Sequence, residues 1–331
     1  MKKLTLSLIC LSFIFLTAQS QIVNIADVNF KKALIEQGVD KNNDGQIQQS
    51  EAQQIDSLKF IDISIESLSG IEAFTSLTKL ICSNNQLKSI DVSKNIALKY
   101  LWCYYNELTT IDISKNTALI NLICSNNLLT TIDISNNTFL TNLICSNNQL
   151  KIIDISKNVN LTSLICSNNQ LTSIDVSQNT NLTYLYCYNN LFTSIDVSKN
   201  TALIYLWCYN NQLKTIDISN NTALTELYCY NNQITYLDFS KNNALTYLYC
   251  YNNQLTNIDI SKNSNLIELN CNKNKLTHLN ISKNMLLTAL YCLDNPNLKT
   301  ICLNKSQFSF TKTNADNWQK DQLTSWDADC K

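Results

Sequence analysis

Apolar residues recur along this chain with a period of 21 residues. In the first clear copy, residues 77–97, the apolar positions are Leu77, Leu80, Cys82, Leu87, Ile90 and Val92. Ten further copies follow, and a cysteine marks each of the eleven: Cys82, Cys103, Cys124, Cys145, Cys166, Cys187, Cys208, Cys229, Cys250, Cys271 and Cys292. One such unit is too short to bury its apolar face alone, so the fixed period predicts a solenoid of stacked units.

Each copy has two halves with the same apolar spacing, and neither half has room for a helix. The pattern therefore predicts a parallel β-solenoid with two ladders of short strands and about 4.8 Å between successive coils, here called rungs. The chain has three glycines, all before the repeats, so asparagine is expected to form the turns. The Asn85 and Asn95 columns, meaning the asparagines at these two positions in successive copies, are interpreted as structural groups that satisfy turn backbone atoms.

The spacing Leu77-x-x-Leu80-x-Cys82-x-x-Asn85-x-Leu87 is the leucine-rich repeat signature, with cysteine at the third apolar site. Over residues 58 to about 303, the chain resembles the nested 21-residue class of bacterial leucine-rich repeat proteins and, more broadly, internalin-like surface proteins. The resemblance implies a mainly β fold, a leucine-rich repeat parallel β-solenoid of about eleven rungs. It also implies a role in protein interaction or adhesion.

The ends of the chain differ in composition from the repeats. Residues 1–20 combine Lys2 and Lys3 with an apolar run and small residues near position 20, which predicts a secretory signal peptide. No later stretch reaches about 18 apolar residues, so no transmembrane segment is expected in the mature chain. We expect an exported bacterial protein, secreted or at the cell surface. Its remaining parts are a small helical cap (21–57), an irregular capping repeat (58–76), the solenoid (77–303) and a C-terminal cap (304–331).

Residues 40–51, DKNNDGQIQQSE, match the EF-hand calcium loop, with Gly45 at the sharp turn. The expected Ca²⁺ ligands are Asp40, Asn42, Asp44, the main-chain carbonyl of Gln46, Gln48 and Glu51. Helices are predicted on both sides, over 27–39 and 51–58. The apolar face of the first is expected at Val28, Phe30, Leu34 and Ile35. The sequence thus predicts one structural calcium site in an EF-hand-like cap; the alternative is a metal-free helix–turn–helix.

Two further columns carry chemistry that could be structural or functional. The cysteine column is interpreted as mostly free buried thiols, with disulfides between adjacent rungs as the alternative. Cys302 and Cys330 lie outside the repeat and are candidates for a disulfide that closes the C-terminal segment. Aspartates from Asp91 to Asp259 form a carboxylate column, interpreted as an edge neutralised by nearby serines and lysines; a row of weak calcium sites is the alternative.

Composition excludes two functional classes. Charged residues make up 15% of the chain and the formal net charge is −1, so no nucleic-acid-binding surface is expected. The chain has one histidine, His278, and no nucleophile–base set, phosphate loop or paired-acid motif stands out from the repeats. We therefore do not expect an enzyme.

Aromatic residues gather at three outward positions of the first-half strand. Because side chains alternate along a strand, positions 79, 81 and 83 of the first copy and their equivalents should point away from the core. They hold 15 aromatics in 33 places, against 9% for the chain. Fourteen of these are the candidate ligand-binding face: Tyr100, Trp102, Tyr104, Tyr184, Tyr186, Tyr188, Tyr205, Trp207, Tyr209, Tyr228, Tyr230, Tyr247, Tyr249 and Tyr251; the fifteenth is Tyr291.

Three interpretations of this face remain open. Exposed aromatics mark interaction surfaces, and an uncharged aromatic sheet suits a protein or peptide partner. A glycan suits it too, because sugar rings stack on aromatic faces. The third interpretation is a structural spacer, in which Tyr and Trp favour strands and stack along the ladder. We favour a non-catalytic binding protein that engages a protein partner through this face.

Overall fold

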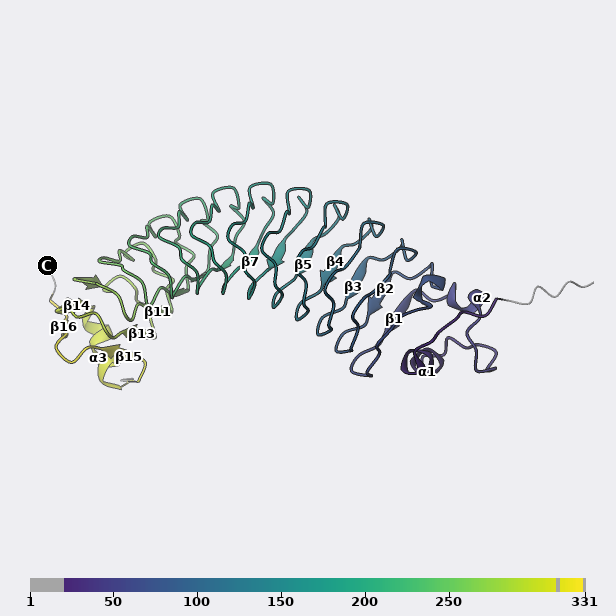
Figure 1. The fold of residues 1–331 in the computed structure, drawn as a ribbon. Helices are drawn as coiled ribbons and strands as arrows, with labels where there is room; N and C mark the ends of the chain where they lie inside the picture. The colour runs from purple at the N-terminus through teal and green to yellow at the C-terminus, as the bar shows by residue number, and fades with distance from the viewer. Residues whose placement is uncertain (1–20, 314–315, 330–331) are drawn as a thin grey trace, which may run out of the picture.

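The computed structural model describes residues 21–313 and 316–329, so the predicted signal peptide and Cys330 lie outside the described residues. The coils stack side by side into a long curved arch, with one cap at each end (Figure 1). A short 3-10 helix spans Ile71–Ala73. The other elements are α1 (Val28–Glu36), α2 (Gln49–Ala52), β1 (Ser57–Lys59), β2 (Lys79–Ile81), β3 (Tyr100–Trp102), β4 (Asn121–Ile123), β5 (Asn142–Ile144), β6 (Ser163–Ile165), β7 (Tyr184–Tyr186), β8 (Tyr205–Trp207), β9 (Glu226–Tyr228), β10 (Tyr247–Tyr249), β11 (Glu268–Asn270), β12 (Leu279–Asn280), β13 (Ala289–Cys292), β14 (Thr300–Cys302), α3 (Lys305–Thr313), β15 (Trp318–Lys320) and β16 (Ser325–Asp327).

One parallel sheet runs the length of the stack. Its 13 strands follow the order β1 to β11, then β13 and β15. Every pairing is in register, so Leu164 stands beside Leu185 and Leu185 beside Leu206. The eleven copies supply β2 to β11 and β13, and the capping segments supply β1 and β15. The sheet is therefore longer than the eleven predicted rungs, because both caps add a strand to it.

The predicted second ladder is wrong for most of the stack. In the second halves of the described repeats, strand pairing is limited to the isolated bridge Asp91↔Asp112 and the short sheet β12–β14–β16. In the other repeats, the second half forms tight turns instead of strands. In one of them, the Asp175 carboxylate accepts the N–H of Ser177 at 2.9 Å. Two residues later, the Asn179 N–H donates to the Val176 carbonyl at 3.0 Å. These local hydrogen bonds use the backbone N–H groups that a second ladder would need.

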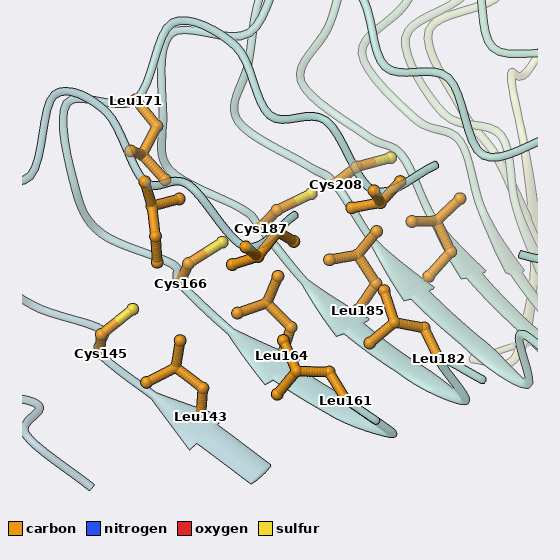
Figure 2. Close-up of a cluster of buried hydrophobic side chains, with 14 of the residues drawn as sticks. Leu143, Cys145, Leu161, Leu164, Cys166, Leu171, Leu182, Leu185, Cys187 and Cys208 are labelled. Carbon is orange, nitrogen blue, oxygen red and sulfur yellow. The ribbon is translucent and has the colours of Figure 1, made fainter. Parts of the chain in front are cut away.

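The inward positions fill one continuous core. Leu164 and Leu185 are fully buried, and so are the cysteines of the same rungs. Figure 2 shows Cys145, Cys166, Cys187 and Cys208 one after another along the stack, beside rows of leucines. All eleven cysteines of this column are free, which confirms the free-thiol interpretation. Burial raises the pKa of thiols such as Cys166 to about 12, so they are neutral and unreactive at physiological pH.

The two asparagine columns are structural, as the sequence predicts. The Asn169 Nδ2 donates to the carbonyls of Cys145 and Cys166 (3.1 Å each), and its Oδ1 accepts the Leu150 N–H at 3.0 Å. In the other column, the fully buried Asn179 donates to two carbonyls, while its Oδ1 has no hydrogen-bond partner. Residues of that column therefore contribute two hydrogen-bond donors each, and their amide oxygen contributes no hydrogen bond. Asparagine also supplies the left-handed residue of most turns, such as Asn168 with φ of 54°.

The N-terminal cap is less helical than the sequence predicts. Of the predicted helix over 51–58, only Glu51 and Ala52 are helical, as the end of the four-residue α2, and Leu58 lies in β1. In α1, Phe30, Ala33 and Leu34 are buried, whereas Val28 and Ile35, both predicted on the apolar face, are exposed. The buried face of α1, which packs against the first rung, is therefore narrower than the apolar face that the sequence periodicity predicts. The Gln37 side chain covers the open edge of β1, donating to the Lys59 carbonyl and accepting its N–H.

The C-terminal cap closes the other end by imitating a rung. Strand β15 pairs with β13 and β16 pairs with β14, and Trp318, 4% exposed, packs onto the core. The Gln307 amide donates to the carbonyls of Ile281 and Asn284, as an asparagine of the Asn95 column does in a full rung. Cys302 is disulfide-bonded. Because Cys330 lies outside the described residues, its pairing with Cys302 stays a prediction.

Candidate functional site

The predicted aromatic positions do lie on the outer surface of the long sheet. In strand β8, Leu206 is fully buried, whereas Tyr205 and Trp207 on either side are partly exposed. The same alternation holds in β7, β9 and β10. The aromatic residues at the outward positions of β7 to β10, and at the position two residues after each of these strands, form what we call the aromatic block: Tyr184, Tyr186, Tyr188, Tyr205, Trp207, Tyr209, Tyr228, Tyr230, Tyr247, Tyr249 and Tyr251.

Two rows of stacked rings make up most of the aromatic block. The central stack is Tyr186, Trp207, Tyr228 and Tyr249, with ring centroids 4.1, 5.0 and 4.5 Å apart. The lateral stack is Tyr188, Tyr209, Tyr230 and Tyr251, at 4.3, 4.2 and 4.2 Å. All six pairs are within 13° of parallel. In-register parallel strands place equivalent side chains next to each other, which produces these rows.

Stacking decides which parts of the rings are presented to a ligand. A ring inside a row, such as Trp207 or Tyr209, has a neighbour against each face. It therefore presents its edge and, for tyrosine, its hydroxyl. Sugar rings bind aromatic side chains through the ring face, so this arrangement suits a glycan less well than a protein surface. Ring edges and hydroxyls supply the apolar area and polar handles typical of protein interfaces.

Five tyrosine hydroxyls of the block, those of Tyr186, Tyr209, Tyr228, Tyr249 and Tyr251, have raised pKa values and are neutral at physiological pH. Burial raises the pKa of the Tyr186 and Tyr251 hydroxyls to about 12. Burial likewise raises the pKa of Tyr228 and Tyr249, and nearby carboxylates, chiefly Glu226 and Glu268, add to the effect. Neutral phenols both donate and accept hydrogen bonds.

Glu226 and Glu268 belong to the same surface, although the sequence analysis did not single them out. Both occupy the outward position equivalent to Lys79, in one row with Tyr205 and Tyr247. The Trp207 Nε1–H donates to Glu226 Oε2 at 3.3 Å, and the Tyr249 hydroxyl donates to Glu268 Oε1 at 2.6 Å. The 21-residue register, applied to every residue type and not only to aromatics, would have found them.

An asparagine ladder, which the sequence analysis also missed, borders the lateral stack. Each side-chain amide donates to the oxygen of the next, in the row Asn252, Asn231, Asn210, Asn189 and Asn168. These residues occupy the left-handed turn position. A continuous row of hydrogen-bonded amides therefore lies along one edge of the aromatic block.

The remaining predicted aromatics form a separate N-terminal patch of Tyr100, Trp102 and Tyr104. The Trp102 Nε1–H donates to Asn121 Oδ1 at 2.8 Å, and the Lys79 ammonium lies 5.2 Å from the Trp102 ring centroid. Three rungs separate this patch from the aromatic block. We call these three rungs the aliphatic rungs. At the positions equivalent to the aromatic ones, they carry Asn121, Ile123, Ser125, Asn142, Ile144, Ser146, Ser163, Ile165 and Ser167, of which Ser125, Ser146 and Ser167 are buried.

The predicted calcium loop is closed by hydrogen bonds of its own carboxylates. Asp40 accepts the N–H groups of Asp44 and Gly45, and Asp44 accepts that of Gln46. Glu51 accepts the N–H groups of Lys41 and Asn42 with one oxygen and that of Gln48 with the other. In the described chain, no three Asp, Glu, His or Cys side chains form a group that could hold a metal ion. Gly45 has a φ of +78°, as the sharp EF-hand turn requires. Calcium binding stays a prediction.

The aspartate column is a hydrogen-bonded edge. Each carboxylate accepts the N–H of the serine two residues later, as Asp133 does from Ser135 at 3.0 Å. That hydrogen bond, joined by the Ser135 hydroxyl, lowers the pKa of Asp133. The two ion pairs of the described residues, Lys32–Glu36 and Lys305–Asp329, involve no member of the column. Serine donors therefore stabilise these carboxylates, and the predicted lysine neighbours act only through longer-range attraction. His278 is exposed.

Comparisons with known proteins agree with the fold. A family model described as "Leucine Rich repeats (2 copies)" matches residues 75–116, 159–200 and 201–242. The solved functional domain of InlJ from Listeria monocytogenes, described as including a cysteine ladder, is 30% identical, with 91% of this chain and 81% of that chain covered and a TM-score of 0.68. No curated protein matches.

Two more distant structures share the fold alone. The internalin InlF of Listeria monocytogenes is 22% identical over 96% of this chain and all of that one, with a TM-score of 0.70. A leucine-rich repeat protein of Leptospira interrogans is 21% identical over 78% of this chain and 81% of that one, with a TM-score of 0.61. No helix among the described residues has the length and apolar character needed to cross a membrane.

Proposed function

Because the chain belongs to the internalin-like leucine-rich repeat family, whose scaffolds serve protein interaction, we propose that it is a non-catalytic binding protein that engages a protein partner through the aromatic block. The observation that supports this most strongly is the pair of ring stacks on the outer surface of the sheet. The core needs none of these rings, since the leucines and cysteines on the other side of each strand fill it. We further propose, from the pattern of residues 1–20, that the chain is exported and acts outside the cytoplasm, free or at the cell surface.

A peptide-display selection against the purified protein tests this proposal, with a glycan array run in parallel. Each hit is measured again with Trp207→Ala/Tyr209→Ala, which opens both stacks, and with Ile144→Ala/Ser146→Ala, a matched pair in the aliphatic rungs. We expect peptide hits that the first variant loses and the second keeps. Glycan hits lost in the first variant would instead make the block a carbohydrate site. Hits that survive in both would place the binding site elsewhere, and a protein without peptide or glycan hits would be better described as a structural spacer.

We also propose one structural calcium ion in the N-terminal cap. Asp40, Asn42, Asp44 and Gln48 would bind it with side-chain oxygens, the Gln46 carbonyl would contribute from the backbone, and Glu51 would close the loop. The support is the ligand spacing together with the positive φ of Gly45. Glu51 also accepts backbone N–H groups from both ends of the loop, so calcium would add charge stabilisation to a turn that is already closed. Titration calorimetry with Ca²⁺ tests the site.

A further inference from the structure

The row of outward residues beside the central stack alternates tyrosine and glutamate. Tyr205, Glu226, Tyr247 and Glu268 stand next to one another on β8 to β11. Both carboxylates are partly exposed and lie on the same surface as the stacked rings. The aromatic block is therefore acidic along one side, although the whole chain is almost neutral.

Both carboxylates are held in place but carry no counter-charge. Each has one oxygen fixed by an aromatic donor, Trp207 for Glu226 and Tyr249 for Glu268. Neither takes part in an ion pair with another described residue. The outward residues of β7 to β10 include no lysine or arginine. Lys273 and Lys275 stand at turn positions of the next rung, that of β11. A partner would have to supply the missing cations.

Ring geometry at the same place suits a cation. Tyr247 lies between the two glutamates and belongs to no ring pair among the described residues, unlike the tyrosines of the two stacks. Tyr205 is tilted by 53° from Tyr184. Their ring faces are therefore less covered than those inside the stacks. A guanidinium or ammonium group can then meet a carboxylate and an aromatic face together.

We propose that the aromatic block binds a cationic peptide segment of its protein partner, with arginine or lysine side chains seated at Glu226 and Glu268. This inference rests on the proposed function. The two glutamates are two rungs apart, which is about 10 Å at the usual strand spacing. The segment would carry two basic side chains at about that separation. Hydroxyls of the central stack would contact the segment between them.

The charge at the opposite end of the sheet would set the orientation of the bound partner. The N-terminal patch carries Lys79 over Trp102, and Lys99 precedes Tyr100, so its charge is positive. The aliphatic rungs between the two aromatic regions are neutral. A partner aligned along the sheet would place its basic segment on β8 to β11 and keep it away from β2 and β3.

An array of 12-residue peptides tests the inference. Each peptide carries two arginines at a different separation, and each has a twin with citrulline, the neutral analogue of arginine. The protein is probed as wild type, as Glu226→Gln/Glu268→Gln, and as Asp238→Asn/Asp259→Asn, which removes the same charge from the opposite half of nearby repeats. Glutamine keeps the acceptor for Trp207 and Tyr249, and unfolding curves establish that each variant is folded.

We expect arginine peptides to bind at least tenfold more tightly than their citrulline twins, and the glutamine pair to remove that preference. The asparagine pair should bind as wild type does. Equal binding of arginine and citrulline peptides, absence of any arginine-dependent binding, or an unchanged preference in the glutamine pair would each overturn the inference. If neutral peptides bind and Trp207→Ala/Tyr209→Ala abolishes their binding, the proposed function stands without the cationic partner. If that variant also binds normally, both proposals fail.

Discussion

The aliphatic rungs and the aromatic block are the same structure with different outward residues. Leu143 of β5 and Leu206 of β8 are both fully buried, and each rung contributes one buried cysteine. Asn169 in the aliphatic rungs and Asn232 in the block make the same four hydrogen bonds, with distances between 2.9 and 3.2 Å. Ile and Ser occupy in one region the positions that Tyr and Trp occupy in the other. The inward columns are therefore the same in both regions, and the two regions differ at the outward columns.

The largest expected difference between the two regions is the effect of alanine substitutions on peptide binding. Trp207→Ala/Tyr209→Ala should weaken binding of a selected peptide by about 100-fold or more, because central aromatic residues dominate interface energies. Ile144→Ala/Ser146→Ala should leave the dissociation constant within about twofold. Titration of the same labelled peptide with both variants measures this. Equal losses in the two variants would remove the distinction between the regions.

The second effect should be the same in both regions. Asn169→Ala and Asn232→Ala each leave one backbone N–H and several carbonyls without their side-chain partner. Each should lower the free energy of unfolding by about 2 kcal/mol. Urea unfolding of the two variants beside wild type gives the values. An unchanged curve for either would contradict the structural role of the column, and a much larger cost in the block would show that the ring stacks depend on it.

Calcium should stabilise the N-terminal cap to the same extent whether or not the aromatic block is intact. Saturating Ca²⁺ should raise the free energy of unfolding by about 1–3 kcal/mol, because only the folded loop gathers its ligands. Asp44→Asn keeps the acceptor for the Gln46 N–H but removes a charged ligand, so it should reduce the effect. The Trp207→Ala/Tyr209→Ala variant should respond as wild type does. Thermal unfolding in Ca²⁺ and in chelator measures it, and identical midpoints would leave the loop metal-free.

The smallest effect concerns acid. Backbone N–H groups of Ser135 and Ser198 lower the pKa of Asp133 and Asp196 in the folded protein below its value of about 3.9 in the unfolded chain. The resulting stability is fully present above about pH 4 and is lost as the pH falls through the folded pKa. Asp133→Asn/Asp154→Asn and Asp196→Asn/Asp217→Asn should both flatten this acid dependence, to the same extent. Urea unfolding midpoints measured between pH 5 and pH 2.5 test this. A different acid dependence in the two double variants would contradict the expectation.

Sequence periodicity predicts the inward half of this structure well. Each rung meets nearly the same surroundings, so one residue at a repeat position reports on all eleven. Leu80, Cys82 and Asn85 could be assigned to the core or to its turns from spacing alone. Their burial and hydrogen bonds agree with that assignment.

The parts that sequence reasoning missed depend on local competition or on neighbours in space. The second ladder is absent from most rungs because aspartate and asparagine form tight turns that consume the same N–H groups. The expected helix over 51–58 gives way to β1, which gains a strand partner in β2. Stacking along the ladder is expected only under the structural-spacer interpretation, and the alternation of side chains alone predicts that Trp207 points outward but not that two tyrosines cover its faces.

The most direct test gives the aromatic block the outward residues of the aliphatic rungs. The variant combines Tyr186→Ile, Tyr188→Ser, Trp207→Ile, Tyr209→Ser, Tyr228→Ile and Tyr230→Ser, and its thermal unfolding and peptide binding are measured on one preparation. We expect an unfolding midpoint within about 5 °C of wild type and binding weakened by about 100-fold or more. A variant that fails to fold would show that the ring stacks hold the solenoid together. A folded variant that still binds would show that the partner docks on another surface.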